Sequence, residues 1–320
     1  MPTVSIAIRA FRRRWLAEAI ASVLAQTHRD LELVVYDDAG DLEALALATR
    51  DPRVRYHRAD APRSASGRFA AAVGLCRGEY LGLLDDDDVY APDFVATLAG
   101  ALDADPEAGV AFCRTTWDDD GRRVAPRDPR PAGRVRDAAA AMLRDGWTVS
   151  PSHLLLRRTA YEAALRDQPM PPGVNPDSFV NLRVALAGWA HVLVDAPLVV
   201  MRWHGSQVSR AYPVAADAAV ATWRSLHLTD PVLAMLRDRR LGQALRVRAF
   251  EHLRAGAVDL ARADLDAAAD ACPDLSPRAR ALSLAVACGP FGTAAVRAAS
   301  ALAPIGRRRR RPPTRIGRPL

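Results

Sequence analysis

Lysine is absent from the 320 residues of this chain, so all 44 of its basic residues are arginine. Seven of these arginines follow Gly306 in a stretch without acidic residues, and the other 37 equal the 37 Asp and Glu in number. The net charge of +7 and the pI near 9.8 therefore belong to the C-terminal tail, while the rest of the chain is neutral. Because no aromatic residues interleave the arginines, we expect no nucleic-acid partner.

Cysteine is also scarce. The four cysteines are widely spaced, and none forms a C-x-x-C pair, so a zinc site or a disulfide framework is not expected. No basic leader precedes an apolar segment at the N-terminus, and no run of about 18 uninterrupted apolar residues is present. These absences predict a cytoplasmic protein, with attachment to the inner face of a membrane as the alternative for its C-terminal end.

What the chain does contain, from its N-terminus to about residue 200, is short apolar runs alternating with helix-like segments. This β-α-β rhythm predicts an α/β fold with a mostly parallel sheet flanked by helices. The polar, Gly- and Pro-rich stretch from Asp118 to Gly133 is expected to be a long loop. The expected strands are Val4–Ile8, Leu31–Tyr36, Val54–Arg58, Tyr80–Leu84, Val110–Thr115, Leu154–Arg157 and Val192–Val194, and the expected helices are Trp15–Gln26, Ser66–Cys76, Pro92–Leu102 and Phe179–Ala187.

Beyond about residue 215 the pattern changes to helices rich in Ala, Leu and Arg. We therefore expect an α/β domain over residues 1–214, an α-helical extension over 215–305 and a disordered Arg-rich tail over 306–320.

Four consecutive carboxylates, Asp85, Asp86, Asp87 and Asp88, follow the predicted strand YLGLL directly. Adjacent carboxylates repel one another unless a cation or hydrogen bonds compensate. Hard oxygen ligands suit Mg²⁺ or Mn²⁺, and ligands of open α/β sheets bind at the carboxyl ends of the strands. The pattern therefore predicts a divalent metal site, with a solvated, helix-capping turn as the alternative.

A second acidic pair, Asp37 and Asp38, follows another buried strand. A carboxylate at this place can accept hydrogen bonds from a base or a ribose. The alternative is a loop in which one Asp caps the next helix.

Four segments in order resemble the inverting glycosyltransferases of family 2, which have the GT-A fold. They cover residues 3 to about 210 and read VSIAIRAFRRRWLAEAIASVLAQTHRDLELVVYDDAGD, GEYLGLLDDDDVYAP, NPDSFVNLRVALAGW and RWHGSQVS. Each segment alone would be weak, but the four together in family order are specific. The resemblance implies transfer of a sugar from a nucleoside diphosphate sugar to a glycan or lipid-linked acceptor, with inversion and with a divalent metal, Mg or Mn.

The resemblance also implies roles for single residues. In the donor site, Phe11 stands where an aromatic commonly lies against the base, and Asp37 and Asp38 match the pair that contacts base and ribose. Arg68 stands one position before the family's Arg-Asn pair and is expected to reach a phosphate. Asp85 and Asp87 match the acids of the D-x-D metal site, and Asp85 and the intervening Asp86 are also expected to contact the donor. Asp87 matches the principal metal ligand, with Asp85 and His204 beside it, and His204 stands near the diphosphate. Asp177 matches the general base that takes the proton of the acceptor hydroxyl.

The chain departs from the family pattern at several positions. The first loop reads Arg9-Ala10-Phe11-Arg12 in place of P-T-Y-N, Phe69 and Ala70 replace an Arg-Asn pair, and Pro176 replaces a Glu beside the base. These changes keep a second interpretation open, a non-catalytic member that binds nucleotide sugars or acts as a scaffold.

The last apolar segment, 279–305, is interrupted by arginines and prolines and is followed by five arginines, Arg307 to Arg311. Basic residues beside an apolar helix favour anionic lipid. Peripheral membrane contact is one expectation for this end, and a packed terminal helix with a solvated tail is the other.

Overall fold

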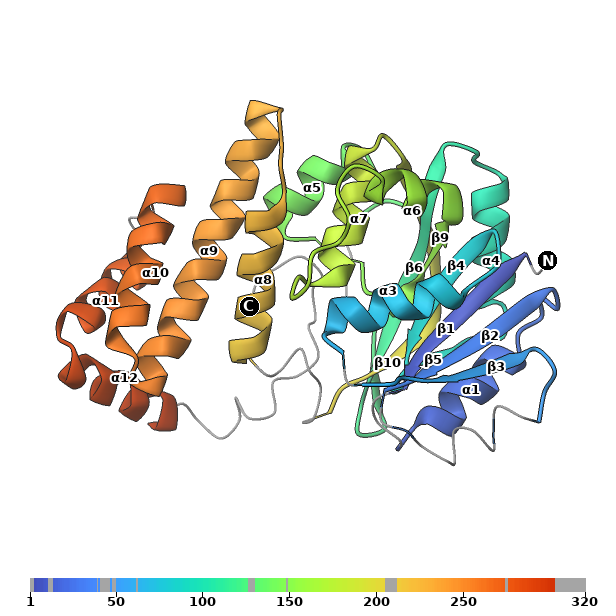
Figure 1. Cartoon of the computed structure of the whole chain (residues 1–320), viewed down its shortest axis with the longest axis horizontal. Coiled ribbons are helices and arrows are strands. Elements are labelled where there is room, and N and C mark those ends of the chain that lie inside the picture. The colour runs from blue at the N-terminus through green and yellow to red at the C-terminus, as the bar shows by residue number, and fades with distance from the viewer. Residues whose placement is uncertain are drawn as a thin grey trace. The chain divides into compact units, whose positions relative to one another are not determined.

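The structure is a computed structural model, and it describes residues 3–10, 14–38, 40, 47, 50–61, 63–125, 130–147, 149–204, 212–273 and 276–302 (Figure 1). Within these residues the chain divides into two compact units. The first runs to residue 172 and from 176 to 204, and the second takes residues 173–175 and the helices beyond 204. The expected boundary at residue 214 stays a prediction, because the preceding residues 205–211 lie outside the described part.

The first unit is built on one mixed sheet. Its strand order is β3-β2-β1-β4-β9-β6-β10-β5, with β7 added to β6 and β8 added to β10. The strands are β1 (Val4–Ala10), β2 (Leu31–Asp37), β3 (Val54–Arg58), β4 (Tyr80–Asp85), β5 (Val89–Tyr90), β6 (Ala108–Asp119), β7 (Arg122–Val124), β8 (Gly133–Arg134), β9 (Leu154–Arg157) and β10 (Ala190–Arg202).

The sheet is parallel over β3, β2, β1 and β4, as the alternation of short strands and helices predicts. β9 then runs antiparallel to both of its neighbours, β4 and β6. β6 and β10 are parallel to each other again. The α/β class with a helical C-terminal region is therefore confirmed, and the sheet is mixed, with four adjacent parallel strands at one side and the parallel pair β6 and β10 beyond β9.

Helices cover both faces of this sheet. The helices are α1 (Leu16–Leu24), α3 (Ala65–Leu75), α4 (Phe94–Asp103), α5 (Ala138–Asp145), α6 (Arg158–Leu165) and α7 (Pro176–Leu186). α1 and α4 share one apolar core with Val4, Ile6 and Ile8 of β1. Side chains alternate along a strand, so Arg9 projects to the opposite face, where its guanidinium lies over the Phe69 ring of α3. α7 contacts α3, α5 and α6.

The expectation of a long loop from Asp118 to Gly133 is wrong in its first part. β6 continues to Asp119 and pairs antiparallel with β7, so the segment begins as a hairpin. Asp120 and Gly121 form its turn with φ angles of 55° and 87°. Asp-Gly tolerates positive φ at both turn positions and is a strong hairpin signal, which the polar composition of the segment hid. Residues 126–129 lie outside the described part.

The second unit consists of α-helices that pack against their neighbours in the sequence. They are α8 (Tyr212–Ser225), α9 (Pro231–Ala255), α10 (Val258–Ala271), α11 (Pro277–Ala287) and α12 (Pro290–Leu302). Asp230 caps α9 by accepting a hydrogen bond from the Leu233 amide, and Gly256 ends it with φ of 93°. Two small apolar clusters, around Leu245 and around Leu253, join α9 to the helices beside it.

Among the described residues, none of the helices combines the length and the apolar character that crossing a bilayer requires. The expected tail, 306–320, lies outside the described residues.

Candidate active site

The carboxyl end of β1 lies between the two acidic clusters. Ala10 of β1 is in register with Asp37 of β2 on one side, and Arg9 is in register with Asp85 of β4 on the other. Asp37 and Asp85 are therefore two strand spacings apart, a backbone separation of about 10 Å. The structure thus brings both clusters to one edge of the sheet, within the reach of one nucleotide-sized ligand.

The first cluster is fixed by hydrogen bonds. Asp37 is fully buried, and its carboxylate accepts from the Gly40 amide at 2.8 Å and from the Tyr56 hydroxyl at 2.8 Å. The side chain of Asp38 is 1% exposed and accepts from Arg68 of α3 at 3.1 Å. Its Oδ1 is buried and accepts no hydrogen bond within the described part of the chain, so it could take one from a ligand.

The expected donor site also includes Arg68 and Phe11. Arg68 is held on Asp38 and on the Arg63 carbonyl at 2.6 Å, so it orders the acidic pair in this structure. Phe11 lies outside the described residues, and its role against the base stays a prediction.

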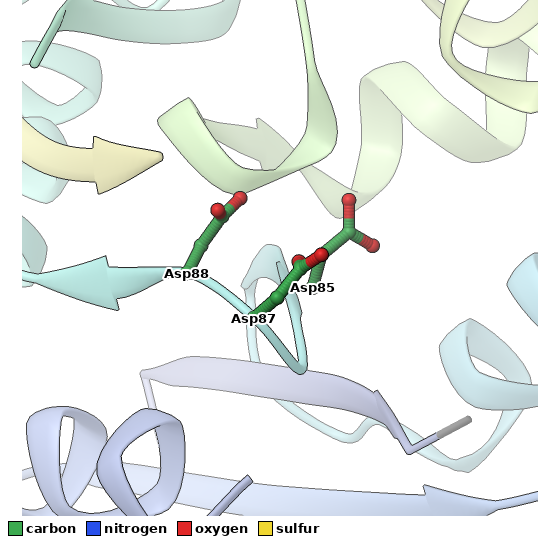
Figure 2. A group of neighbouring side chains, drawn as sticks. All are labelled: Asp85, Asp87 and Asp88. Carbon is green, nitrogen blue, oxygen red and sulfur yellow. The ribbon is translucent and has the colours of Figure 1, made fainter. Parts of the chain in front are cut away.

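The second cluster lies on the turn between β4 and β5. Figure 2 shows Asp85, Asp87 and Asp88 projecting to the same side of this turn. One carboxylate oxygen from each lies within 4.8 Å of the others, which is compatible with one cation held by hard oxygen ligands. Asp86 is also buried at this turn. Asp88 belongs to the acidic run that predicts the metal site, but it was not among the expected metal ligands.

The electrostatics of the turn indicate a deficit of positive charge. Burial, followed by the negative charge of Asp85, raises the pKa of Asp87, although His204 opposes the shift. Burial and the charges of Asp87 and Asp85 raise the pKa of Asp88 well above its ordinary value. A bound divalent cation would favour the ionised form of both carboxyls, because opposite charge lowers a carboxyl pKa. The residues present therefore fit a divalent metal.

The end of β10 closes over this turn. The Arg202 amide donates to Asp88 at 3.1 Å, and its guanidinium donates to the Asp87 carbonyl at 2.9 Å. His204 Nε2 lies 2.8 Å from Asp87 Oδ2, and its ring packs on Trp15 with centroids 4.5 Å apart. His204 therefore contacts the second acidic cluster at the carboxylate of Asp87. Ser152 adds a further link by accepting from the Asp85 amide at 3.1 Å.

Asp177 lies in the first turn of α7, on the face of the sheet to which Arg9 and Asp85 project. Its Oδ1 is buried and accepts no hydrogen bond from the described residues. Burial raises the pKa of Asp177 to about 7, and the positive charge of Arg9 counteracts part of the shift. A carboxyl that titrates near neutral pH can take up and release a proton under ordinary conditions.

Arg9 is a residue that the sequence showed only as a departure from the family pattern. Its guanidinium donates to Asp85 Oδ1 and forms an ion pair with it. Arg202, Trp15 and Ser152 were likewise missed, because their contacts join segments far apart in the chain. For Arg9 a signal existed, since it and Asp85 directly follow the expected strands Val4–Ile8 and Tyr80–Leu84.

Comparison with known proteins places this geometry in a family. The model of Glycosyl transferase family 2 matches residues 5–165, half of the chain, and the chain belongs to that family. The first unit is thus a glycosyltransferase domain with the GT-A fold.

One relative is the succinoglycan biosynthesis protein ExoO of Rhizobium meliloti (strain 1021), which is 36% identical over 107 residues. The match covers 32% of this chain and 31% of that protein, so this chain aligns with less than a third of the relative's length.

Two solved structures share the fold. The TarS 1-349 structure of S. aureus in complex with UDP-GlcNAc has a TM-score of 0.67 at 15% identity, covering 94% of this chain and 92% of the other. The mannosyltransferase PcManGT of Pyrobaculum calidifontis, in complex with GDP-Man and Mn2+, has a TM-score of 0.57 at 18% identity. The match covers 94% of this chain and 86% of PcManGT.

Proposed function

We propose that this protein transfers a sugar from a nucleoside diphosphate sugar to an acceptor hydroxyl, with inversion at the anomeric carbon and with a divalent metal. The observation that carries the proposal is the pair of acidic clusters on either side of the end of β1, with Asp177 on the neighbouring helix. Membership of family 2 and the sugar-nucleotide complexes of the two structural neighbours support it.

In this proposal the first cluster binds the nucleoside. Asp37 and Asp38 hold fixed carboxylates beside β1. The buried Oδ1 of Asp38, which accepts no hydrogen bond from the described residues, offers an acceptor for a ribose hydroxyl or a base N–H. Phe11 follows β1 directly in the sequence and would lie against the base.

The second cluster would hold Mg²⁺ or Mn²⁺ through Asp87 and Asp85, with Asp88 beside them. Such an ion, when bound, stabilises the negative charge that develops on the departing diphosphate. His204 and Arg202 orient Asp87 and Asp88 through the contacts described above.

Asp177 would act as the general base. The acceptor hydroxyl has a high pKa and must lose its proton as its oxygen attacks the sugar, and a carboxylate that titrates near 7 can take that proton. A single attack from the face opposite the diphosphate inverts the anomeric carbon.

A panel of nucleotide sugars tests the donor assignment directly. We expect at least one uridine or guanosine diphosphate sugar to raise the melting temperature in the presence of Mn²⁺, because a ligand that binds only the folded state stabilises it. The Asp87→Ala variant should lose the metal-dependent part of that rise. An equal rise in the variant would remove Asp87 as metal ligand.

A lipid-linked glycan is the acceptor class that the C-terminal end favours. Phe291 of α12 is 84% exposed and Leu284 of α11 is 67% exposed, and the sequence continues beyond α12 into Arg307 to Arg311. Exposed apolar residues followed by a basic cluster suit shallow, reversible contact with an anionic membrane surface.

A further inference from the structure

Arg9 is a buried cation at the centre of the site. Its side chain is 12% exposed, while that of its partner Asp85 is 38% exposed. Because the two residues are in register on adjacent parallel strands, their side chains project to the same face of the sheet. The most accessible carboxylate of the metal-compatible cluster is thus already paired with a cation of the protein.

The surroundings of Arg9 leave part of its hydrogen-bonding capacity open. Its Nε is buried and has no acceptor among the described residues. The centroid of the Phe69 ring lies 6.0 Å from the guanidinium carbon. An arginine guanidinium keeps its charge in proteins, and the ion pair with Asp85 favours the charged form further. Arg9 therefore stays charged, and it has a donor for a further acceptor.

We propose that Arg9 is the resting counter-cation of Asp85 and that it pairs with the diphosphate of the donor when a divalent metal takes Asp85. The proposal rests on the function proposed above and deepens it by naming the residue that contacts the diphosphate.

The exchange follows from the cost of an unpaired buried charge. A metal that binds Asp85 competes with the guanidinium for this carboxylate, and the mostly buried arginine then needs a further counter-ion. A diphosphate supplies that counter-ion, because its oxygens match the fork of the guanidinium and can satisfy two of its donors at once. Metal alone therefore binds weakly, and metal with diphosphate binds well.

The consequence is cooperativity between two ligands. Each one should raise the affinity for the other by the same factor, since coupling between two binding events is reciprocal. Arg9 strengthens this coupling, so the protein holds more metal when a nucleotide sugar is bound.

Calorimetry on the full chain tests this with three probes: Mn²⁺ alone, inorganic pyrophosphate in EDTA, and pyrophosphate in the presence of Mn²⁺. In the Arg9→Met variant we expect Mn²⁺ alone to bind about tenfold more tightly and pyrophosphate in EDTA to bind about tenfold more weakly, with a coupling factor smaller than that of the wild type. Arg55→Met is the matched control, because Arg55 also forms an ion pair, with Glu32 at 2.9 Å, on the other side of β2. It should leave all three affinities unchanged.

Arg9→Lys keeps the test valid if Arg9→Met fails to fold, which circular dichroism would show. Lysine keeps a positive charge beside Asp85 but lacks the paired N–H donors of the guanidinium. Mn²⁺ binding should therefore stay weak, while the pyrophosphate affinity in EDTA falls. Unchanged Mn²⁺ and pyrophosphate affinities in both variants would overturn the proposal. Asp87→Asn tests the proposed metal site independently of Arg9. If this variant loses Mn²⁺ binding while both Arg9 variants keep the wild-type affinities for Mn²⁺ and pyrophosphate, only the role of Arg9 is refuted.

Discussion

A single residue, Asp177, sets the expected pH dependence of turnover. Its pKa lies near 7 mainly because the carboxyl is buried, so the base form is a minority below neutral pH. We predict that kcat rises about tenfold per pH unit below pH 7 and levels off above it. Asp177→Asn should bind donor as well as the wild type and lose turnover at every pH. An unchanged rate in this variant would remove Asp177 as the base.

The same shift has a consequence for stability, measured without metal. Because the folded pKa lies above the ordinary value of 3.8, the folded protein holds a proton between about pH 4 and pH 7 that the unfolded chain has released. Stability should therefore fall as the pH rises through this window. Asp177→Asn has no carboxyl at this position and so lacks this pH-dependent contribution to stability. Its melting temperature, relative to that of the wild type, should therefore rise as the pH is raised from 4 to 8 in EDTA.

At the scale of secondary-structure elements, Gly109 lets β6 approach α6 and α7 closely. A Cβ at this position would lie 2.7 Å from Trp189 Cβ, 2.8 Å from Ala160 Cβ and 2.9 Å from Val184 Cγ1. We predict that Gly109→Ala lowers the free energy of unfolding by about 1–3 kcal/mol, because a packed core resists added volume. Urea denaturation measures this. Gly100→Ala, where the added Cβ meets nothing within 4 Å, is the control and should be neutral or stabilising.

α9 and α10 are joined by a two-point ion pair. Arg248 donates to both carboxylate oxygens of the buried Asp264, at 2.8 Å and 2.6 Å. Asp264→Asn should cost about 3 kcal/mol, because breaking a buried pair leaves a poorly compensated charge. Glu162→Gln, which removes an i,i+4 pair of the exposed Glu162 with Arg158 on α6, should cost under about 1 kcal/mol. Equal effects of the two variants on the urea midpoint would contradict this difference.

The elements that the sequence predicts well are those whose apolar pattern is local. The parallel strands β1 to β4, helix α4 and the helices of the second unit follow from periodicity and caps. β5, α5 and α6 could not be predicted in the same way. β5 has two residues, and the first turn of α6 directly follows β9 with no capping side chain.

For the site, the positions of Asp37 and Asp85 followed from strand ends, because carboxyl ends of parallel strands share an edge. The pairing of Arg9 with Asp85 needed the strand register. The contact of Trp15 with His204 joins residues almost 190 positions apart, and it depends on tertiary packing that local sequence patterns do not encode.

At the scale of the whole molecule, charge is distributed unevenly along the chain, with the excess arginines in the last 14 residues. We predict that full-length protein sediments with vesicles containing anionic lipid at low salt and is released at high salt, because such attraction is screened. Deletion of residues 307–320 should abolish sedimentation and leave donor binding unchanged. Full-length protein that stays in the supernatant at low salt would remove the proposed membrane contact.

The central claim is catalysis of sugar transfer rather than binding alone, and release of the nucleoside diphosphate measures it most directly. A coupled assay should detect slow hydrolysis of the preferred nucleotide sugar with Mn²⁺ and without acceptor, and this release should be lost in EDTA and in Asp87→Ala. Binding of a nucleotide sugar without any release, with Mn²⁺ and a range of acceptor glycans present, would contradict the account and favour a non-catalytic, nucleotide-sugar-binding member of the family.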